Sequence, residues 1–445
     1  MRKKISACLT IALVFALLCG CVESGDELLR PPRPAMLYAQ LESAVSGLLS
    51  SGHRYSPPVS GEYRQAVQLI DIDGDGTEEA VVFLRGSGEK PLKIYFYTLK
   101  DKAYAQAAVI ESAGESIQSV DFCDFNLDGI KEMVVGWRLG AVRALSVYVM
   151  GEGLAAEILS APYSQYVLQD ITGDGYPRLL TVQLDPATAS GRVEMYAHSG
   201  EVMELTGDAY LSPGVESLLR VRYGMLSDKK QGLFIASQYN KSGVVTDIFT
   251  SRNGLLVNVS ASLETGVSEQ LIRYTDQAAT DINGDGVMDL PRLEPLPPYD
   301  SLIEEVDPVN EIFWYSYDSW GRAAEVAHTY HSLAGNWFLS VPQAWRGRLT
   351  VGRQTTATAR VTTFACYMGE GEPPVDLLTI TALSARPEND YEYTSDPDYV
   401  VLINHADLFI YAALNSRLPA AISGMAMTEA ELRASFATIR SDWIT

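Results

Sequence analysis

The feature that most constrains the fold of this chain is a nine-residue acidic pattern that recurs along it. The copies are DIDGDGTEE (71–79), DFNLDGIKE (124–132), DITGDGYPR (170–178) and DINGDGVMD (281–289). The last gap between copies is about twice as long as the others, which predicts one more copy inside it. There the sequence reads MLSDKKQGLFIAS (225–237), where the glycine and the following strand remain but the acidic ladder is lost. Five copies of one structural unit therefore follow one another.

Short apolar runs between these loops have the composition of β-strands. They are rich in Val, Tyr and Phe and lack a long helical periodicity. Examples are EEAVVFL (78–84), KIYFYTL (93–99), KEMVVGW (131–137) and IFWYSYD (312–318). Each unit contains about four strands, which is the content of one propeller blade. The sequence therefore predicts a mainly β chain, with a β-propeller of about five blades over residues 53–331.

The spacing of oxygen-bearing residues in the loops is that of a calcium site. Ca²⁺ takes six to eight oxygen ligands at about 2.3–2.6 Å. Side chains at positions 1, 3 and 5 of a curled loop point inward, glycine at position 6 permits the turn, position 7 offers its carbonyl, and an acid at position 9 closes the shell. The candidate ligands of the three complete loops are Asp71, Asp73, Asp75, Thr77 and Glu79; Asp124, Asn126, Asp128, Ile130 and Glu132; and Asp281, Asn283, Asp285, Val287 and Asp289. Ca²⁺ is the expected cofactor, in a structural role.

The third loop departs from this pattern at its ninth position. It keeps Asp170, Thr172, Asp174 and the carbonyl of Tyr176, but Arg178 stands where the closing acid is expected. A guanidinium cannot bind a metal, and its charge opposes one. This loop therefore either binds Ca²⁺ weakly or keeps only the shape of the site.

Two other kinds of loop share part of this pattern. An EF-hand needs an acid at position 12 followed by a helix; position 12 is instead Val82, Val135, Thr181 or Arg292. Plain Asp-Gly turns without metal would also use these residues, but three complete matches at near-regular spacing favour the metal sites. The loops resemble the FG-GAP/VCBS repeats of integrin-α-type β-propellers over roughly residues 63–330. The resemblance implies inter-strand loops that each hold one Ca²⁺ on one face of the propeller, although the Phe-Gly and Gly-Ala-Pro elements of that family are not evident.

The first residues of the chain predict export and lipid attachment. A basic start at residues 2–4 precedes an apolar stretch, residues 5–18, that is short for a membrane span of about 20 residues. The sequence Leu-Cys-Gly-Cys ending at Cys21 resembles the bacterial lipobox. We therefore expect a signal peptide over 1–20, a lipid on Cys21 that holds the protein to the membrane, and a tether over 21–35. The alternative is an ordinary signal peptide or an uncleaved anchor.

Two further regions flank the repeats. An amphipathic helix is predicted over residues 36–52, and a small α+β domain over 332–445. The second region ends in a helix that starts at a capping box of Thr428 and Glu431. The apolar face of that helix is expected to hold Leu432, Phe436, Ile439 and Trp443. The region resembles PsbP/Mog1-type domains.

Composition and missing motifs limit the function. The net charge of −22 opposes nucleic-acid binding. No HExxH, G-x-S-x-G, P-loop or Rossmann pattern occurs, and His328 and His331 are expected to be surface or partly packed residues. The separation of Cys123 and Cys366 gives no reason to pair them.

These observations predict a protein without catalytic machinery, at the cell surface or on the periplasmic face of a membrane. Its calcium-stabilised propeller would act as an adhesion, binding or scaffold module for a protein or glycan. The alternative is an accessory or catalytic component of extracellular polysaccharide processing.

Overall fold

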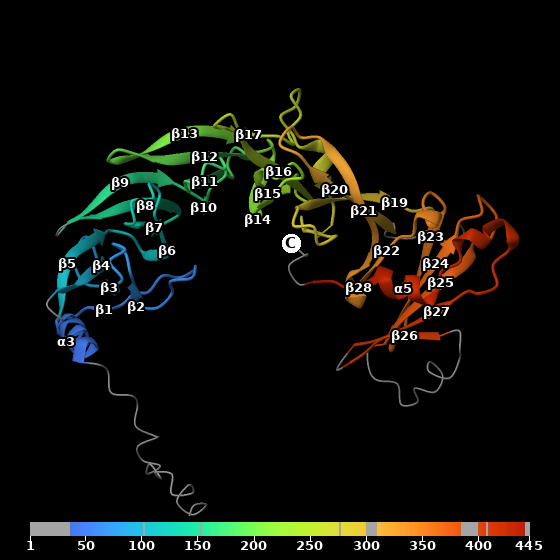
Figure 1. The fold of residues 1–445 in the computed structure, drawn as a ribbon, viewed down its shortest axis with the longest axis horizontal. Helices are drawn as coiled ribbons and strands as arrows, with labels where there is room; N and C mark the ends of the chain where they lie inside the picture. The colour runs from blue at the N-terminus through green and yellow to red at the C-terminus, as the bar shows by residue number, and fades with distance from the viewer. Residues whose placement is uncertain are drawn as a thin grey trace, which may run out of the picture. The chain divides into compact units, whose positions relative to one another are not determined.

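The computed structural model describes residues 36–100, 103–151, 154–275, 277–299, 309–383, 399–405 and 408–440. It divides into two compact units, of which the first holds residues up to 157 apart from 123–128 and 143–145, and the second holds the rest. Within the described residues the fold is mainly β, with six antiparallel sheets (Figure 1). The mainly β prediction is confirmed, and five of the sheets are propeller-type blades.

Each blade-like sheet is a meander of neighbouring strands. The first contains β1 (Arg54–Tyr55), β2 (Val67–Ile70), β3 (Glu79–Arg85), β4 (Leu92–Lys100) and β5 (Ala103–Ser112). The second contains β6 (Ser116–Cys123), β7 (Glu132–Leu139), β8 (Val142–Gly151) and β9 (Leu154–Pro162). The third contains β10 (Gln165–Gln169), β11 (Arg178–Asp185), β12 (Ser190–Ser199) and β13 (Val202–Tyr210).

The fourth and fifth sheets follow the same plan with additions. The fourth contains β14 (Val215–Met225), β15 (Gln231–Tyr239), β16 (Gly243–Arg252), β17 (Leu255–Asn258) and β18 (Ile272–Arg273), and the 3-10 turn η1 (Glu269–Leu271) precedes β18. The fifth contains β19 (Asp289–Pro295), β20 (Asn310–Tyr317), β21 (Ala323–Ser332), β22 (Trp337–Ser340) and β28 (Phe436–Thr438), and the 3-10 turn η2 (Leu333–Gly335) joins β21 to β22.

The acidic loops occupy one equivalent place in the sheets. The first three join β2 to β3, β6 to β7 and β10 to β11, and the last leads into β19 through a bridge between Thr280 and Asp289. The degenerate copy also falls in place, because the turn after Met225 joins β14 to β15. The additional copy predicted there is confirmed. It is the fourth of five along the chain, and the loop over residues 281–289 is the fifth.

Apolar side chains on alternate faces of the strands form cores between consecutive sheets. On β3, Val81 and Phe83 face the second sheet, whereas Val82 and Leu84 face the other way. Separate cores lie between the third and fourth sheets and between the fourth and fifth. The strands that follow the loops in the first, second and fourth sheets, β3, β7 and β15, are therefore buried on both faces, which explains their continuous apolar runs.

The outer face of the first sheet is covered by the predicted N-terminal helix. This helix, α3 (Met36–Ser50), lies beside the first sheet (Figure 1). Its Leu41 and Val45 pack against Val82 and the neighbouring residues of β3 and β4. It ends before Gly52, whose φ of +98° is one that glycine adopts without strain. The helix predicted for this segment is confirmed.

The C-terminal region has a sheet of its own, in the order β23-β24-β25-β27-β26. The strands are β23 (Leu349–Thr355), β24 (Ala359–Cys366), β25 (Val375–Leu383), β26 (Tyr399–His405) and β27 (Leu408–Leu414). One core joins this sheet to β21 and β22 of the fifth sheet and to the short helical segments η3 (Gln343–Trp345), η4 (Ala420–Met425) and α5 (Glu429–Ser435). Residue 332, where the C-terminal domain is predicted to begin, lies inside the fifth sheet, because β21 ends there and pairs with β22.

The final helix is shorter than its apolar pattern predicts. The capping box of Thr428 and Glu431 is present, but α5 ends at Ser435. Phe436 then starts β28, which pairs with β22 and packs its ring 5.8 Å from that of Trp337. The expected helical face through Phe436 and Ile439 is therefore wrong, because pairing with a free strand edge outweighs the helical periodicity. Trp443 lies outside the described residues.

The segments predicted as signal peptide, lipidation site and tether, residues 1–35, also lie outside the described residues. Among the described helices, none is long and apolar enough to cross a membrane.

Candidate metal-binding loops

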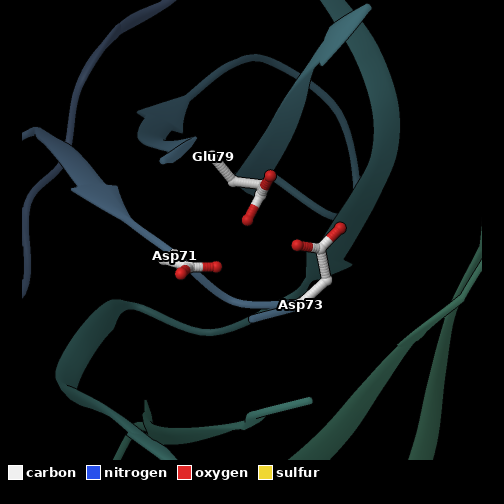
Figure 2. A group of neighbouring side chains, drawn as sticks. All are labelled: Asp71, Asp73 and Glu79. Carbon is white, nitrogen blue, oxygen red and sulfur yellow. The ribbon is translucent and has the colours of Figure 1, made fainter. Parts of the chain in front are cut away.

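The first loop brings three carboxylates together. Oxygen atoms of Asp71, Asp73 and Glu79 all lie within 4.8 Å of one another, and Figure 2 shows the three side chains converging. Two oxygens bound to one Ca²⁺ at about 2.4 Å are separated by at most about 5 Å. Asp71 and Asp73 come from the loop, whereas Glu79 is the first residue of β3. This spacing fits a single hard cation.

Backbone hydrogen bonds hold the first loop in a tight curl. The N–H of Gly76 donates to Asp71 Oδ2 at 3.1 Å, and the N–H of Thr77 donates to Asp75 Oδ1 at 2.7 Å. The N–H of Ile72 donates to Glu79 Oε2 at 2.9 Å, so that the closing acid is fixed across the loop. Each acid thus has one oxygen occupied by the chain itself and another left for a further ligand.

The electrostatics of the first loop favour a bound cation. Burial, followed by repulsion from Asp73, Asp75 and Asp71, raises the pKa of Glu79, although its bond from Ile72 opposes the shift. Asp71 Oδ1 is buried without a hydrogen-bond partner. A buried carboxylate oxygen without a partner is costly unless a cation approaches it. The residues present therefore fit Ca²⁺.

The loop over residues 281–289, the fifth along the chain, repeats the hydrogen-bond pattern of the first loop. The N–H groups of Gly284 and Gly286 donate to the two oxygens of Asp281 at 2.7 and 2.8 Å. The N–H of Ile282 donates to Asp289 Oδ2 at 3.2 Å, as Ile72 does to Glu79 in the first loop. Asp289 is fully buried and its Oδ1 has no hydrogen-bond partner. Burial and then repulsion from Asp285 and Asp281 raise the pKa of Asp289 to about 7.

The second loop forms the same turn with one strained residue. The N–H of Asp128 donates to Asp124 Oδ1 at 3.2 Å and to Asn126 Oδ1 at 3.1 Å. At the fourth position Leu127 has a φ of +59°, where the first, third and fifth loops have glycine. A left-handed leucine costs about 1–2 kcal/mol. The ninth-position acid, Glu132, is buried at the start of β7.

In the third loop, an arginine takes the place of the cation. Arg178 Nη2 donates to Asp174 Oδ2 at 2.6 Å, and Nη1 donates to the carbonyl of Tyr176 at 2.7 Å. These are the fifth-position carboxylate and seventh-position carbonyl that would bind Ca²⁺. Burial raises the pKa of Asp170, but bonds from the N–H groups of Gly175 and Gly173 hold it below its usual value. The structure thus favours a loop that keeps the shape of the site.

Neighbouring repeats are bonded to each other through these loops. The ammonium group of Lys131 donates to the carbonyl of Asp71 at 2.8 Å, and the backbone N–H of Lys131 donates to the carbonyl of Ile72 at 2.7 Å. In the second unit, the N–H of Met288 donates to the carbonyl of Met225 at 2.9 Å. Ordering a loop therefore also orders the contact to the adjacent repeat.

The two histidines near the end of the repeats differ in burial. His328 is buried and its Nε2 lies 2.7 Å from Glu311 Oε2, whereas His331 is half-buried, and burial lowers its pKa to about 4. The expectation of a surface or partly packed residue is therefore wrong for His328 and right for His331. Neither Cys123 nor Cys366 is in a disulfide. The triad of the first loop is the only His, Cys, Asp and Glu cluster of metal-binding geometry in the described part of the chain.

Fold and loops together define a mainly β protein whose propeller-type blades carry acidic loops. No family model matches the chain, and no curated protein matches its sequence. Among solved structures, it is similar to a Lactobacillus plantarum protein at 11% identity, with 72% of this chain and 85% of that one covered and a TM-score of 0.31. It is similar to Sqt1 of Saccharomyces cerevisiae at 11% identity, with 69% and 83% covered and a TM-score of 0.31. It is also similar to TolB from Acinetobacter baumannii at 10% identity, with 76% and 68% covered and a TM-score of 0.24. These values assign no family.

Proposed function

We propose that this protein is an exported, lipid-anchored, calcium-stabilised binding module for a protein or glycan. The observation that carries the calcium part is the pair of buried, unpartnered oxygens, Asp71 Oδ1 and Asp289 Oδ1, each in an acidic loop, with three carboxylates converging in the first. All the donors offered are oxygens, which hard cations prefer. Charge repulsion within each loop makes the folded protein depend on the cation.

The role of the ion in this proposal is structural. The first loop joins β2 to β3 and is bonded to Lys131 of the next repeat, so a bound ion would order both. Glu79 and Asp289 would supply the closing ligands from β3 and β19, with the loop acids supplying the rest. The second loop, with Asp124, Asn126, Asp128 and Glu132, is proposed as a third site on its sequence pattern.

Calcium binding is tested on protein stripped of divalent cations. Adding Ca²⁺ to a hundred times its dissociation constant is expected to stabilise each occupied unit by about 2.7 kcal/mol, which raises Tm by roughly 5–10 °C. Calorimetric titration of Glu79→Gln should show one site fewer. Glu78→Gln is the matched control, because Glu78 is exposed in the same loop and supplies no ligand in the pattern. No thermal shift at millimolar Ca²⁺ would contradict the proposal.

Lipid attachment is tested separately by Cys21→Ala in the full chain. Because the acyl chains provide the anchor in this proposal, the variant is expected to move from the membrane fraction to the soluble extracytoplasmic fraction. Cys8→Ala, in the apolar stretch, serves as the control and should stay membrane-bound. Membrane retention of Cys21→Ala would show that another feature holds the protein.

A further inference from the structure

Trp320 differs from the other tryptophans that the structure describes. Four of them, Trp137, Trp314, Trp337 and Trp345, are at most 3% exposed, whereas Trp320 is 65% exposed. It lies in the turn between β20 and β21, in the sequence Asp318-Ser-Trp-Gly-Arg322. Its exposed ring offers a flat aromatic face on which a ligand can pack.

The turn that carries Trp320 is held rigidly. Asp318 Oδ1 accepts the N–H groups of Trp320 and Arg322, both at 2.9 Å, and Asp318 Oδ2 accepts Arg322 Nε at 2.6 Å. Gly321 has a φ of +79°, and a side chain there would clash with the carbonyl oxygen of Val259. The ring is therefore presented on a fixed backbone, which lowers the entropic cost of binding.

A second anchor comes from the degenerate fourth loop. Asp228 Oδ2 accepts both the N–H of Ser319, at 3.3 Å, and its hydroxyl, at 2.5 Å. The N–H of Ser227 donates to the carbonyl of Tyr317 at 2.9 Å. Asp228 is the one acid in this loop, from which the acidic ladder of the other repeats is lost. In this structure it positions the Trp320 turn instead of a cation.

Basic groups surround this turn in a protein of net charge −22. The Arg252 guanidinium lies over the Trp320 ring, 5.2 Å from its centroid. Arg322 is in the same turn, and its side chain is 78% exposed. Lys229 and Lys230 are exposed in the turn that contains Asp228. Four cations thus occur in the two turns and the adjoining end of β16, and two of them, Lys229 and Lys230, stand where the other repeats have acidic loops.

We infer that Trp320 and Arg252 form a binding site for an acidic glycan, a polysaccharide containing uronate residues. The inference rests on the proposed binding function and names its ligand class. The C–H groups of a sugar ring pack on a flat aromatic face, and guanidinium groups pair with carboxylates. A protein partner needs roughly 800 Å² per side around an apolar centre, whereas the side chains beside the Trp320 ring include the charged Arg252 and Arg322.

The test measures binding of a short oligogalacturonate at a fixed free Ca²⁺ concentration, by calorimetry and tryptophan fluorescence. Trp320→Ala is expected to weaken binding about tenfold, and Arg252→Gln about threefold. Tyr274→Ala is the control, because Tyr274 is an aromatic residue of the same unit that is 71% exposed. It should bind as the unmodified protein does. A neutral oligoglucoside should bind at least about tenfold more weakly, because it lacks the carboxylate.

Two results would overturn the inference. One is an oligogalacturonate affinity that Trp320→Ala leaves unchanged; the other is equal binding of polyglutamate, which would assign the surface to acidic polypeptides. Calcium titration of the same samples separates this test from the proposed calcium role. Unmodified protein that binds Ca²⁺ but no oligogalacturonate contradicts only the glycan site. Protein that binds the glycan through Trp320 but no Ca²⁺ contradicts only the calcium role.

Discussion

Replacing Asp247 by alanine is expected to lower the free energy of unfolding by about 3–5 kcal/mol, the largest loss predicted for a single side chain of this protein. Asp247 lies on β16 and is fully buried. Its carboxylate accepts the N–H and hydroxyl of Ser212, the hydroxyl of Ser268 and the amide of Asn258, at 2.6–2.9 Å. These groups come from the link between the third and fourth sheets and from two segments after β16. Alanine would leave all these donors buried without an acceptor.

The expected change in Tm is roughly 10 °C. Asp247→Asn should lose less stability than the alanine variant. Its amide oxygen still accepts hydrogen bonds from several of these donors, although its NH₂ group faces one donor from which it cannot accept. The control is Glu204→Ala on β13, an exposed acid whose loss should change stability by at most about 0.5 kcal/mol. Thermal unfolding in saturating Ca²⁺ measures all three. An alanine variant as stable as the control would show that the network contributes little.

Arg178→Glu is expected to convert the third loop from calcium-independent to calcium-dependent. Without Ca²⁺ the variant should lose about 2 kcal/mol, because a third acid joins Asp170 and Asp174 and two bonds of Arg178 disappear. That figure allows for solvent screening of the half-exposed Asp174. With Ca²⁺ at a hundred times its dissociation constant, the new site should return about 2.7 kcal/mol.

Calorimetric titration should count one more Ca²⁺ in Arg178→Glu than in the unmodified protein. Arg178→Gln is the matched control: it removes the same cation without adding an acid, so it should be destabilised without gaining a site. Equal stoichiometry in all three proteins would mean that position 9 does not decide whether this loop binds the ion.

The loops could be predicted from sequence because their geometry is local. Gly76, Gly175 and Gly286 each donate to the first aspartate of their own loop, five residues earlier. Glycine at position 4, also in a left-handed conformation, was not predicted, and Leu127 shows that the backbone adopts this conformation without glycine there. The capping box of Thr428 is local in the same way.

Contacts between distant segments could not be predicted. The end of α5 depends on pairing of Phe436 with Leu339 of β22, almost a hundred residues earlier. The Trp320 turn depends on Asp228 of another repeat, although the basic Lys229 and Lys230 in place of the acidic ladder were a signal that could have pointed to it. Burial of His328 likewise depends on its pairing with Glu311 across the sheet.

The sequence by itself determined the five repeats, the mainly β fold and the identity of the candidate ligands, because loop curvature and strand alternation are set within a few residues. Only the tertiary structure decided how these loops differ. Burial leaves Asp71 and Asp289 each with an unpartnered oxygen, whereas Arg178 folds back onto Asp174 and Tyr176. Whether an acid faces a cation, a guanidinium or a serine depends on which groups packing brings within about 3 Å of it.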